Sequence, residues 1–374
     1  MKIRYFDHAA TTAVSEEVLN AMLPYFRKNY GNPSSMYEIA RISKKAINEA
    51  RAKVAHSINA SPKEIYFTSC GSESDNLAIK GIAYANKEKG NHIITSKIEH
   101  NAVLNTCQRL EKQGYEITYL DVDEKGFVRL DELEDAIKDN TILITIMFAN
   151  NEVGTIEPIE QISKIAKKHN IIFHTDAVQA IGNVRIDVKE LDIDALSMSA
   201  HKFYGPKGVG ALYVKSGINF QRIQDGGHQE MDKRAGTENV AEIVGMGKAI
   251  ESIYRNFDER CNYLKDIRDY YINRVESEIP YATLNGDRIK RLPGNANFSF
   301  KGLTGERILF NLDLNGICAS AGSACATGSL LPSHVLSAMG TTEKLANSTL
   351  RTTFGEENTK EDIDFLVDCL KNIK

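Results

Sequence analysis

A lysine follows one of the apolar runs of the chain and precedes a tight turn. Lys202 comes after the run Ala195–Ser199, and the next residues, 203–208, read Phe-Tyr-Gly-Pro-Lys-Gly. A lysine at a strand end is commonly a solvated surface residue, and a neighbouring lone histidine such as His201 is commonly structural. The glycine- and proline-rich turn and the strand that follow favour the alternative, in which Lys202 points into the crevice at the strand ends. A partly desolvated lysine has a lowered pKa and forms Schiff bases.

An acid stands at a second strand end. Asp176 closes the apolar run Ile171–Asp176, and Gln179 lies three residues further on. A carboxylate in such a place is costly unless it is paired with a cation or hydrogen-bonded. One interpretation makes Asp176 a cap for the following turn. The other makes it the partner of a cationic ring nitrogen.

A loop of small polar residues follows a third run. Residues 68–73 read Thr-Ser-Cys-Gly-Ser-Glu, between the run Ile65–Ser69 and a helical pattern. Small side chains let the backbone approach an anion, and the free amides at a helix start bind phosphate. A simple capped helix start has the same appearance. Together the three strand ends offer an anion cradle, an acid and an amine, which are the three partners that pyridoxal 5'-phosphate (PLP) needs.

The elements that must position these residues alternate along the middle of the chain. Most of the apolar runs lack polar alternation, as strands covered on both faces do. The seven runs are Ile65–Ser69, His92–Ser96, Ile117–Val122, Ile142–Ala149, Ile171–Asp176, Ala195–Ser199 and Gly210–Val214. Helical patterns such as Glu73–Lys87 and Ile159–His169 lie between them. This alternation predicts an α/β fold with a doubly wound, mainly parallel sheet of seven strands, whose ligands bind at the carboxyl ends of the strands.

The pattern changes after about residue 255. A long helical stretch, Phe257–Ile279, precedes the run Asn295–Phe300, and a terminal helix opens with a cap from Thr359 to Asp362. We therefore predict a large domain over residues 15–255. A small α+β domain is predicted over residues 256–374 together with residues 1–14.

Composition narrows the class of protein. The 374 residues are 42% apolar and 26% charged with a formal net charge of -4, which gives no indication of a nucleic-acid partner. No apolar stretch of eighteen residues predicts a membrane span, and the start lacks a signal core. Six scattered cysteines without zinc spacing predict free thiols in a cytoplasmic protein, and no metal site.

Several motifs, in order, resemble one known family. The segments YFDHAATT, HTDAVQA and SAHKFYGPKGVGALYV are similar to those of class V fold-type-I PLP enzymes, and more narrowly of the NifS/IscS-type cysteine desulfurases. The resemblance covers essentially the whole chain. It implies a fold-type-I PLP-dependent transferase with PLP as the cofactor.

Roles at the cofactor ring follow from the resemblance by position. Lys202 would hold PLP, and Asp176 would pair with its ring nitrogen. Gln179 would bind the ring hydroxyl. His100, in SKIEHNAV, would stack on the ring and help to move protons.

The resemblance also implies a phosphate site that two subunits share. Gly71, Ser72, Ser199 and His201 would bind the phosphate from one subunit. Thr237, in RAGTENV, would reach it from the second subunit. This arrangement implies a homodimer with shared active sites.

Substrate binding and sulfur transfer complete the implied site. Asn151 and Arg351 would bind the substrate carboxylate, since a guanidinium matches a carboxylate bidentately. The run Ser320–Ser329 holds Cys325 among small residues that bury little apolar surface, which predicts a mobile loop. By itself this pattern is typical of a surface loop with an incidental thiol. The resemblance makes Cys325 the nucleophile, alongside Lys202 and His100 as the catalytic residues.

The implied activity is conversion of L-cysteine to L-alanine with the sulfur kept as a persulfide on Cys325. The resemblance implies delivery to a sulfur acceptor such as an iron–sulfur scaffold protein. The pathway stays open between iron–sulfur cluster assembly, nitrogenase and tRNA thiolation. The alternatives are a small-amino-acid transaminase, a selenocysteine lyase and a non-enzymatic protein with this fold. A dinucleotide-dependent dehydrogenase is disfavoured, because the first turn lacks G-x-G-x-x-G.

The chain departs from the family pattern at four places. Met231 stands where an arginine is usual, and Tyr37 and Ala40 replace a histidine and a glycine. Glu356 and Glu357 replace a basic and aromatic pair, which predicts a changed partner-facing surface.

Overall fold

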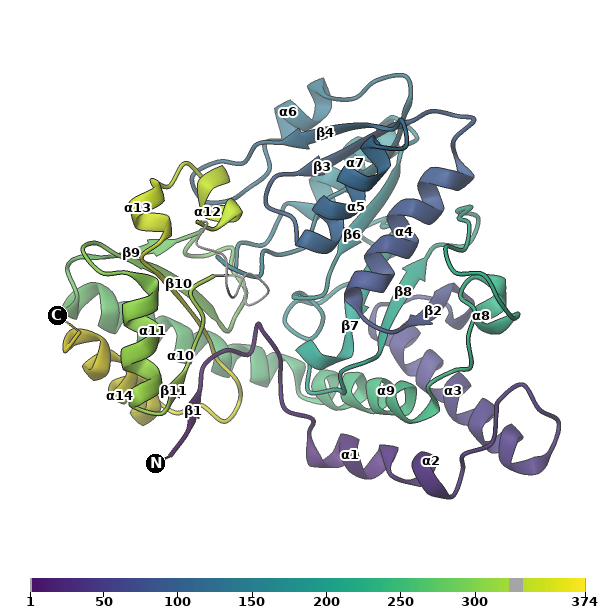
Figure 1. The fold of residues 1–374 in the computed structure, drawn as a ribbon, viewed down its shortest axis with the longest axis horizontal. Helices are drawn as coiled ribbons and strands as arrows, with labels where there is room; N and C mark the ends of the chain where they lie inside the picture. The colour runs from purple at the N-terminus through teal and green to yellow at the C-terminus, as the bar shows by residue number, and fades with distance from the viewer. Residues whose placement is uncertain (1, 323–331, 374) are drawn as a thin grey trace.

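A seven-stranded sheet forms the centre of the protein. The computed structural model (Figure 1) describes residues 2–322 and 332–373. The strand order is β2-β8-β7-β6-β5-β3-β4, with β8 antiparallel to both of its neighbours and the remaining pairs parallel. The strands are β2 (Ile65–Thr68), β3 (His92–Ser96), β4 (Glu116–Leu120), β5 (Thr141–Thr145), β6 (Ile172–Asp176), β7 (Ala195–Ser199) and β8 (Gly210–Val214). The predicted α/β fold is confirmed.

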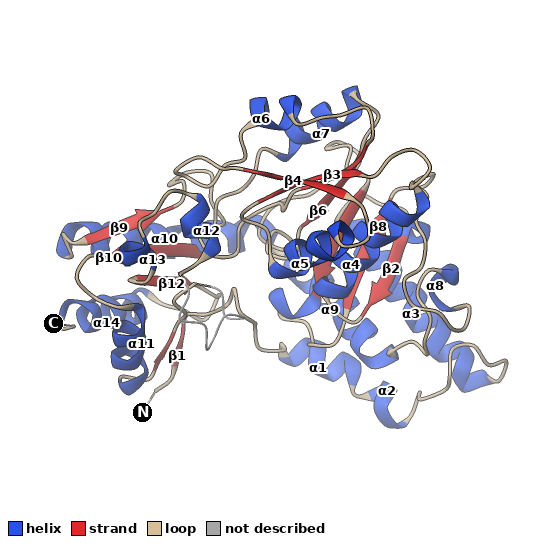
Figure 2. Cartoon of the chain, turned by 45° about the horizontal axis from the view of Figure 1, so that its top comes forward, coloured by secondary structure: helices blue, strands red, loops and turns tan. Residues whose placement is uncertain are grey.

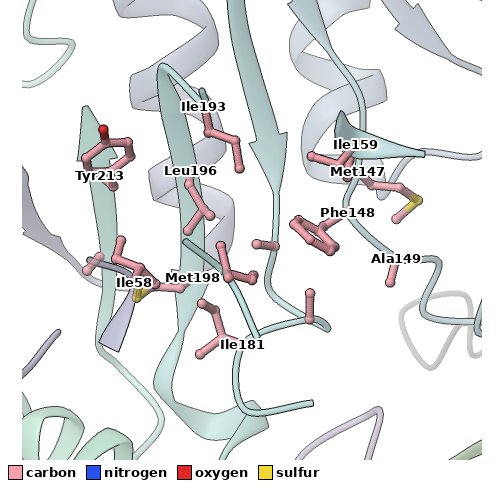
Figure 3. Close-up of a cluster of buried hydrophobic side chains, with 14 of the residues drawn as sticks. Ile58, Met147, Phe148, Ala149, Ile159, Ile181, Ile193, Leu196, Met198 and Tyr213 are labelled. Carbon is pink, nitrogen blue, oxygen red and sulfur yellow. The ribbon is translucent and has the colours of Figure 1, made fainter. Parts of the chain in front are cut away.

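The apolar runs become strands because both faces of the sheet are covered. Consecutive strand residues point to opposite faces, and Ile93 and Ile94 accordingly belong to different core clusters. One face packs against α4 (Gly71–Ala85) and α5 (Asn101–Glu111). The other packs against α3 (Glu38–Ser57), α7 (Ile159–Lys168) and α9 (Val240–Arg255). Figure 2 shows these helices around the sheet, and Figure 3 shows part of the larger cluster.

A second, antiparallel sheet lies beside the first. Its order is β12-β10-β9, formed by Thr349–Thr353, Asn295–Phe300 and Ala282–Asn285. The helices that pack around it are α10 (Phe257–Glu278), α11 (Gly305–Leu314) and α14 (Lys360–Lys371). The N-terminal strand β1 (Arg4–Tyr5) pairs in parallel with β11 (Ile317–Cys318).

The hydrophobic core clusters agree with the predicted domain division at the N-terminus but not at residues 335–336. Phe6 packs with residues between 264 and 373, as expected if the first residues join the second domain. Val335 and Leu336, however, pack into the cluster of the central sheet. The division into residues 15–255 and residues 1–14 with 256–374 therefore stays a prediction.

Short helices complete the chain. Two of them precede α3, one follows β4, one precedes α9 and two precede β12. Two more are single 3-10 turns. They are α1 (Glu16–Met22), α2 (Pro24–Arg27), α6 (Leu130–Asp135), α8 (Gln229–Asp232), α12 (His334–Ala338), α13 (Glu343–Ala346), η1 (Pro62–Glu64) and η2 (Ala200–Lys202). Among the described residues, no helix is both long and apolar enough to cross a bilayer.

Element ends differ from prediction where they serve the site. The helix predicted over Glu73–Lys87 begins earlier, at Gly71, and ends at Ala85, because the small residues of the loop already take helical geometry. The strand predicted over Ile142–Ala149 ends at Thr145, and the chain then turns so that Met147 and Ala149 line a cavity. The cap predicted for the last helix is confirmed, since Thr359 and Asp362 form a capping box.

Candidate active site

The carboxyl ends of the parallel strands open into a cavity of about 190 Å³. The N-terminal segment crosses it, and β12 contributes from the second sheet. The predicted site residues that line it are Gly71, Ser72, His100, Asn151, Asp176, Gln179, Ser199, His201, Lys202 and Arg351. The structure thus brings together residues separated by as much as 280 positions of sequence, from Gly71 to Arg351.

Lys202 ends the short 3-10 turn η2 that follows β7. Its Nζ donates to the carbonyl oxygens of Ala9 (2.6 Å) and Ala10 (2.9 Å). The backbone amide of Thr12 donates to the carbonyl of His201 (2.9 Å), which ties the same turn to the N-terminal segment. Ala9 and Ala10 had no predicted role, although they belong to the YFDHAATT motif. They hold the amine inside the cavity rather than at the surface.

Asp176 caps the turn that follows β6. It is the last residue of β6 and only 5% exposed, and its Oδ1 accepts a hydrogen bond from the amide of Val178 (2.9 Å). One oxygen therefore caps the turn, as the first interpretation predicts, and the pairing with a ring nitrogen stays a prediction. Burial raises the pKa of Asp176, and His100 and Lys202 oppose that rise.

His100 is the N-cap of α5. Its Nδ1 accepts a hydrogen bond from the amide of Ala102 (3.1 Å), so the neutral ring carries its proton on Nε2. Burial lowers the pKa of His100, and the nearby Asp176 only partly offsets this. The imidazole is therefore neutral at neutral pH, with one N–H group available to a bound molecule.

The anion cradle combines a helix start with unsatisfied polar groups. Gly71 is the first residue of the 15-residue helix α4, whose free amides favour an anion. A Cβ at Gly71 would lie 2.6 Å from Cγ2 of Val178, so the position leaves no room for a side chain. The buried Oγ of Ser199 lacks a hydrogen-bond partner among the described residues. A phosphate group fits these donors.

His201 lies on the same side of the cavity. Its Nδ1 is 3.1 Å from Oγ1 of Thr11. Burial, followed by the nearby charges of Lys202 and Lys207, lowers the pKa of His201 to about 4. His201 is therefore neutral at neutral pH and contributes a hydrogen bond rather than a charge.

Arg351 lies on β12 and places a buried guanidinium group at the cavity. It is 1% exposed, its Nη2 pairs with Oδ1 of Asp7 (2.8 Å), and its Nη1 donates to the carbonyl of Asn151 (3.3 Å). Its Nε has no partner in the described part of the chain. Asp7 also accepts from Ser320 Oγ (2.7 Å). The pairing with Asp7 could not be predicted, because the two residues are 344 positions apart.

The remaining predicted residues have different outcomes. Thr237 is exposed and does not line the cavity, although Arg234, three residues before it, pairs with Glu73 (2.8 Å) at the start of α4. Cys325 lies outside the described residues. Gln179 lines the cavity and donates from Nε2 to the carbonyl of Ala9 (3.0 Å).

Sequence reasoning missed Asp75, which also lines the cavity. Donor atoms of Asp75, His100 and Asp176 all lie within 4.8 Å of one another. A signal existed, since Asp75 precedes Ile79 by four residues and Ile82 by seven, a spacing that places it on the buried face of α4.

Comparisons with known proteins agree with this geometry. The family model "Aminotransferase class-V" matches residues 4–366. A cysteine desulfurase IscS of Clostridium botulinum is 57% identical over 371 residues, which cover 99% of this chain and 94% of the relative. A solved NifS-like protein has a TM-score of 0.94 at 36% identity, covering 100% of this chain and 99% of that one. The structure titled "SspA in complex with cysteine" has a TM-score of 0.85 at 38% identity, covering 95% and 100%.

Proposed function

The chain belongs to the class V aminotransferase family, and we propose that it is a PLP-dependent cysteine desulfurase. One observation carries the proposal: an amine, an acid and an anion cradle line one cavity, in a chain whose curated relatives at 54–57% identity are named cysteine desulfurases. The substrate would be L-cysteine, the products L-alanine and a persulfide on Cys325.

The residues present fit PLP. The Ser199 hydroxyl, which has no partner in the described ranges 2–322 and 332–373, and the crowded Gly71 fit a phosphate group. Asp176 fits a protonated ring nitrogen, and Lys202 fits an aldehyde. When bound, PLP supplies an electron sink that stabilises negative charge at the substrate α-carbon. We assign Gln179 to the ring hydroxyl and His100 to the ring face.

Proton transfer falls to Lys202 and His100. Lys202 Nζ accepts the proton from the substrate α-carbon, and the Ala9 and Ala10 carbonyls (2.6 and 2.9 Å) then stabilise the ammonium. His100 offers its Nε2–H group to the substrate. Burial raises the pKa of Asp176, and a protonated ring nitrogen would stabilise its charged form, as the Val178 amide and Lys202 also do.

Sulfur transfer falls to Cys325. Its thiolate attacks the substrate sulfur, so that a sulfur–sulfur bond forms and the carbon–sulfur bond breaks. The electron pair of the broken bond stays with carbon, which takes up a proton and leaves as alanine. The sulfur remains on Cys325 as a persulfide and is passed to an acceptor protein, such as an iron–sulfur scaffold.

Both described ends of the segment that carries Cys325 lie close to Glu152, which follows the cavity-lining Asn151 in sequence. Ser320 exchanges two backbone hydrogen bonds with Arg351 (2.6 and 3.3 Å), and Gly322 lies next to Oε2 of Glu152. On the other side, Ser333 Oγ donates to Glu152 (2.6 Å). Cys325 itself lies outside the described residues, three positions after Gly322 in sequence. This short separation supports the proposal that its thiol acts on the substrate.

The direct test is incubation of the holoenzyme with sulfur-labelled L-cysteine. We expect stoichiometric label on the peptide that contains Cys325 by mass spectrometry, with alanine formed in equal amount. Amino transfer that requires an α-keto acid, with no labelled peptide, would show a transaminase instead. A higher rate with selenocysteine than with cysteine would show a selenocysteine lyase.

Arg351 is proposed to bind the substrate carboxylate, with Asn151 beside it. We expect Arg351→Lys to raise the KM for cysteine about 10- to 100-fold with a smaller change in kcat, because a point charge replaces a bidentate fork. Steady-state kinetics at saturating PLP measures both constants. The matched control is Arg307→Lys on the exposed surface of α11, which should leave both unchanged. An unchanged KM in Arg351→Lys would remove Arg351 from substrate binding.

We propose that the protein is a homodimer in which Thr237 completes the partner's phosphate site. Large apolar side chains are exposed along residues 19–37, including Met36, which is 92% exposed, and such a surface is typical of an interface. Thr237 is itself exposed, as a residue that acts on another subunit must be.

Mixed dimers test the shared site. A dimer of one Lys202→Ala and one Thr237→Ala protomer should regain a single PLP site of wild-type affinity, because that site takes Lys202 from one chain and Thr237 from the other. PLP titration of purified mixed dimers measures this. Binding no tighter than in the Thr237→Ala homodimer would place Thr237 within its own subunit's site.

A further inference from the structure

We infer that Asp75 is a positioning residue that holds a proton beside Asp176, so that the single negative charge of this carboxyl pair stays on Asp176. The part of the inference that concerns the ring nitrogen rests on the proposed PLP binding. The location of the proton rests on the protein alone.

Asp75 is built into the wall of the cavity. It lies in the first half of α4, is 1% exposed, and its Oδ1 has no hydrogen-bond partner among the described residues. One carboxylate oxygen of Asp75, one ring nitrogen of His100 and one carboxylate oxygen of Asp176 all lie within 4.8 Å of one another. Two buried carboxylates this close repel each other and cannot both ionise at moderate pH.

The surroundings of the two acids differ. Asp176 accepts from the amide of Val178 (2.9 Å) and faces Lys202, which lines the same cavity. Asp75 faces the acids Asp176 and Glu99 and the thiol of Cys70. Of its neighbours among the described residues, the hydroxyl of Ser197 favours its ionised form. The shared proton therefore belongs on Asp75. Burial first, and then Asp176, raises the pKa of Asp75 well above its usual value.

Neither of the two imidazoles close to Asp75 supplies a charge. A ring nitrogen of His100 lies within 4.8 Å of the carboxyl group, and burial lowers the pKa of His100. Nε2 of His174 is 3.8 Å from Asp75 Oδ1, but both ring nitrogens have hydroxyl partners, Oγ1 of Thr145 (2.8 Å) and Oγ of Ser197 (3.0 Å). Burial lowers the pKa of His174 to about 3. This imidazole is neutral at working pH, so no counter-charge favours an ionised Asp75.

A consequence follows when Asp176 loses its charge. In Asp176→Asn the repulsion by Asp176 disappears while the burial of Asp75 remains, so a cationic ring nitrogen in the cavity would draw the negative charge onto Asp75. Asp75 should therefore matter little in the wild-type protein and much in the Asp176→Asn background. A purely structural role would give the same effect in both.

A double-mutant cycle of Asp75→Asn and Asp176→Asn tests this, with the PLP dissociation constant as the first measurement. We expect Asp75→Asn alone to change the constant less than twofold. In the Asp176→Asn background the same substitution should weaken binding at least tenfold further. Equal effects in both backgrounds would overturn the inference, whether they are both large or both absent.

The melting temperature of the PLP-free protein at pH 5.5 and pH 8.5 is the second measurement. The folded state keeps the Asp75 proton while the unfolded chain releases it near pH 4, so stability falls as pH rises above that value. Asp75→Asn should reduce the fall in melting temperature between the two pH values. A fall as large as in the wild type would show that Asp75 is ionised when folded.

Glu99→Gln is the matched control. Glu99 is fully buried, its Oε1 accepts from Ser96 Oγ (2.7 Å) and the Met147 amide (2.9 Å), and burial raises its pKa to about 8. Its substitution should also reduce the pH dependence of melting, but it should leave the PLP constant unchanged in both backgrounds. If wild type and variants all fail to bind PLP, the proposed function fails, while the melting comparison still decides where the proton lies.

Discussion

Lys202→Ala should abolish turnover of cysteine, by at least about four orders of magnitude, because it removes both the attachment point of PLP and the base. Among the described residues, no other lysine lines the cavity, so no neighbouring amine can take over. The variant should also lose the visible absorbance of covalently bound PLP. Absorbance spectra and alanine formation measure the two effects.

Lys207→Ala is the matched control. Lys207 lies in the same Gly–Pro turn, five residues on, but its side chain is exposed. It should keep both the absorbance and the activity. Visible absorbance and turnover that persist in Lys202→Ala would mean that another amine holds the cofactor.

The strands are predictable from the sequence because their burial is uniform. Residues of β3, β5, β7 and β8 are all buried, so the apolar runs are continuous in sequence. Polar residues that interrupt or end such runs, as Asp176 and Ser199 do, therefore stand out. This local contrast explains why residue types alone predict much of the cavity lining.

Contacts made across the fold are not predictable from such patterns. The Ala9 carbonyl that holds Lys202 is 193 positions away in sequence, and a backbone carbonyl leaves no mark on residue type. Asp75 was missed for a different reason. It follows the loop of small polar residues so closely that its position is typical of a solvated helix start, whereas the face of α4 that carries it is buried.

The structure shows what the residues that depart from the family pattern contact. Glu356 pairs with Arg260 (2.8 Å) and Glu357 with His8 (2.7 Å), so both acids that replace the usual pair bind within the chain. Met231 is half exposed and has a positive φ of 56°, between Glu230 and Asp232, which also have positive φ. Glu230 pairs with Arg51 (2.6 Å), which holds this turn in place.

Cys325→Ser should keep the absorbance of bound PLP but lose persulfide and alanine formation by several orders of magnitude, as expected when a nucleophile is removed. A serine hydroxyl is not ionised near neutral pH and is a poor nucleophile toward sulfur, whereas a thiolate attacks it readily. Mass mapping of the persulfide and alanine assays measure the loss.

The matched control is Cys318→Ser, at the start of the segment that leads to Cys325. Cys318 lies on β11, and burial, followed by the nearby Asp313 and Asp7, raises the pKa of its thiol. Its thiolate is thus disfavoured, and its loss should leave alanine formation unchanged. Alanine and sulfide made at the wild-type rate by Cys325→Ser, but not by Cys318→Ser, would transfer the role to Cys318. A thiolate nucleophile requires surroundings that do not oppose its charge, and both burial and the two neighbouring acids oppose a thiolate at Cys318.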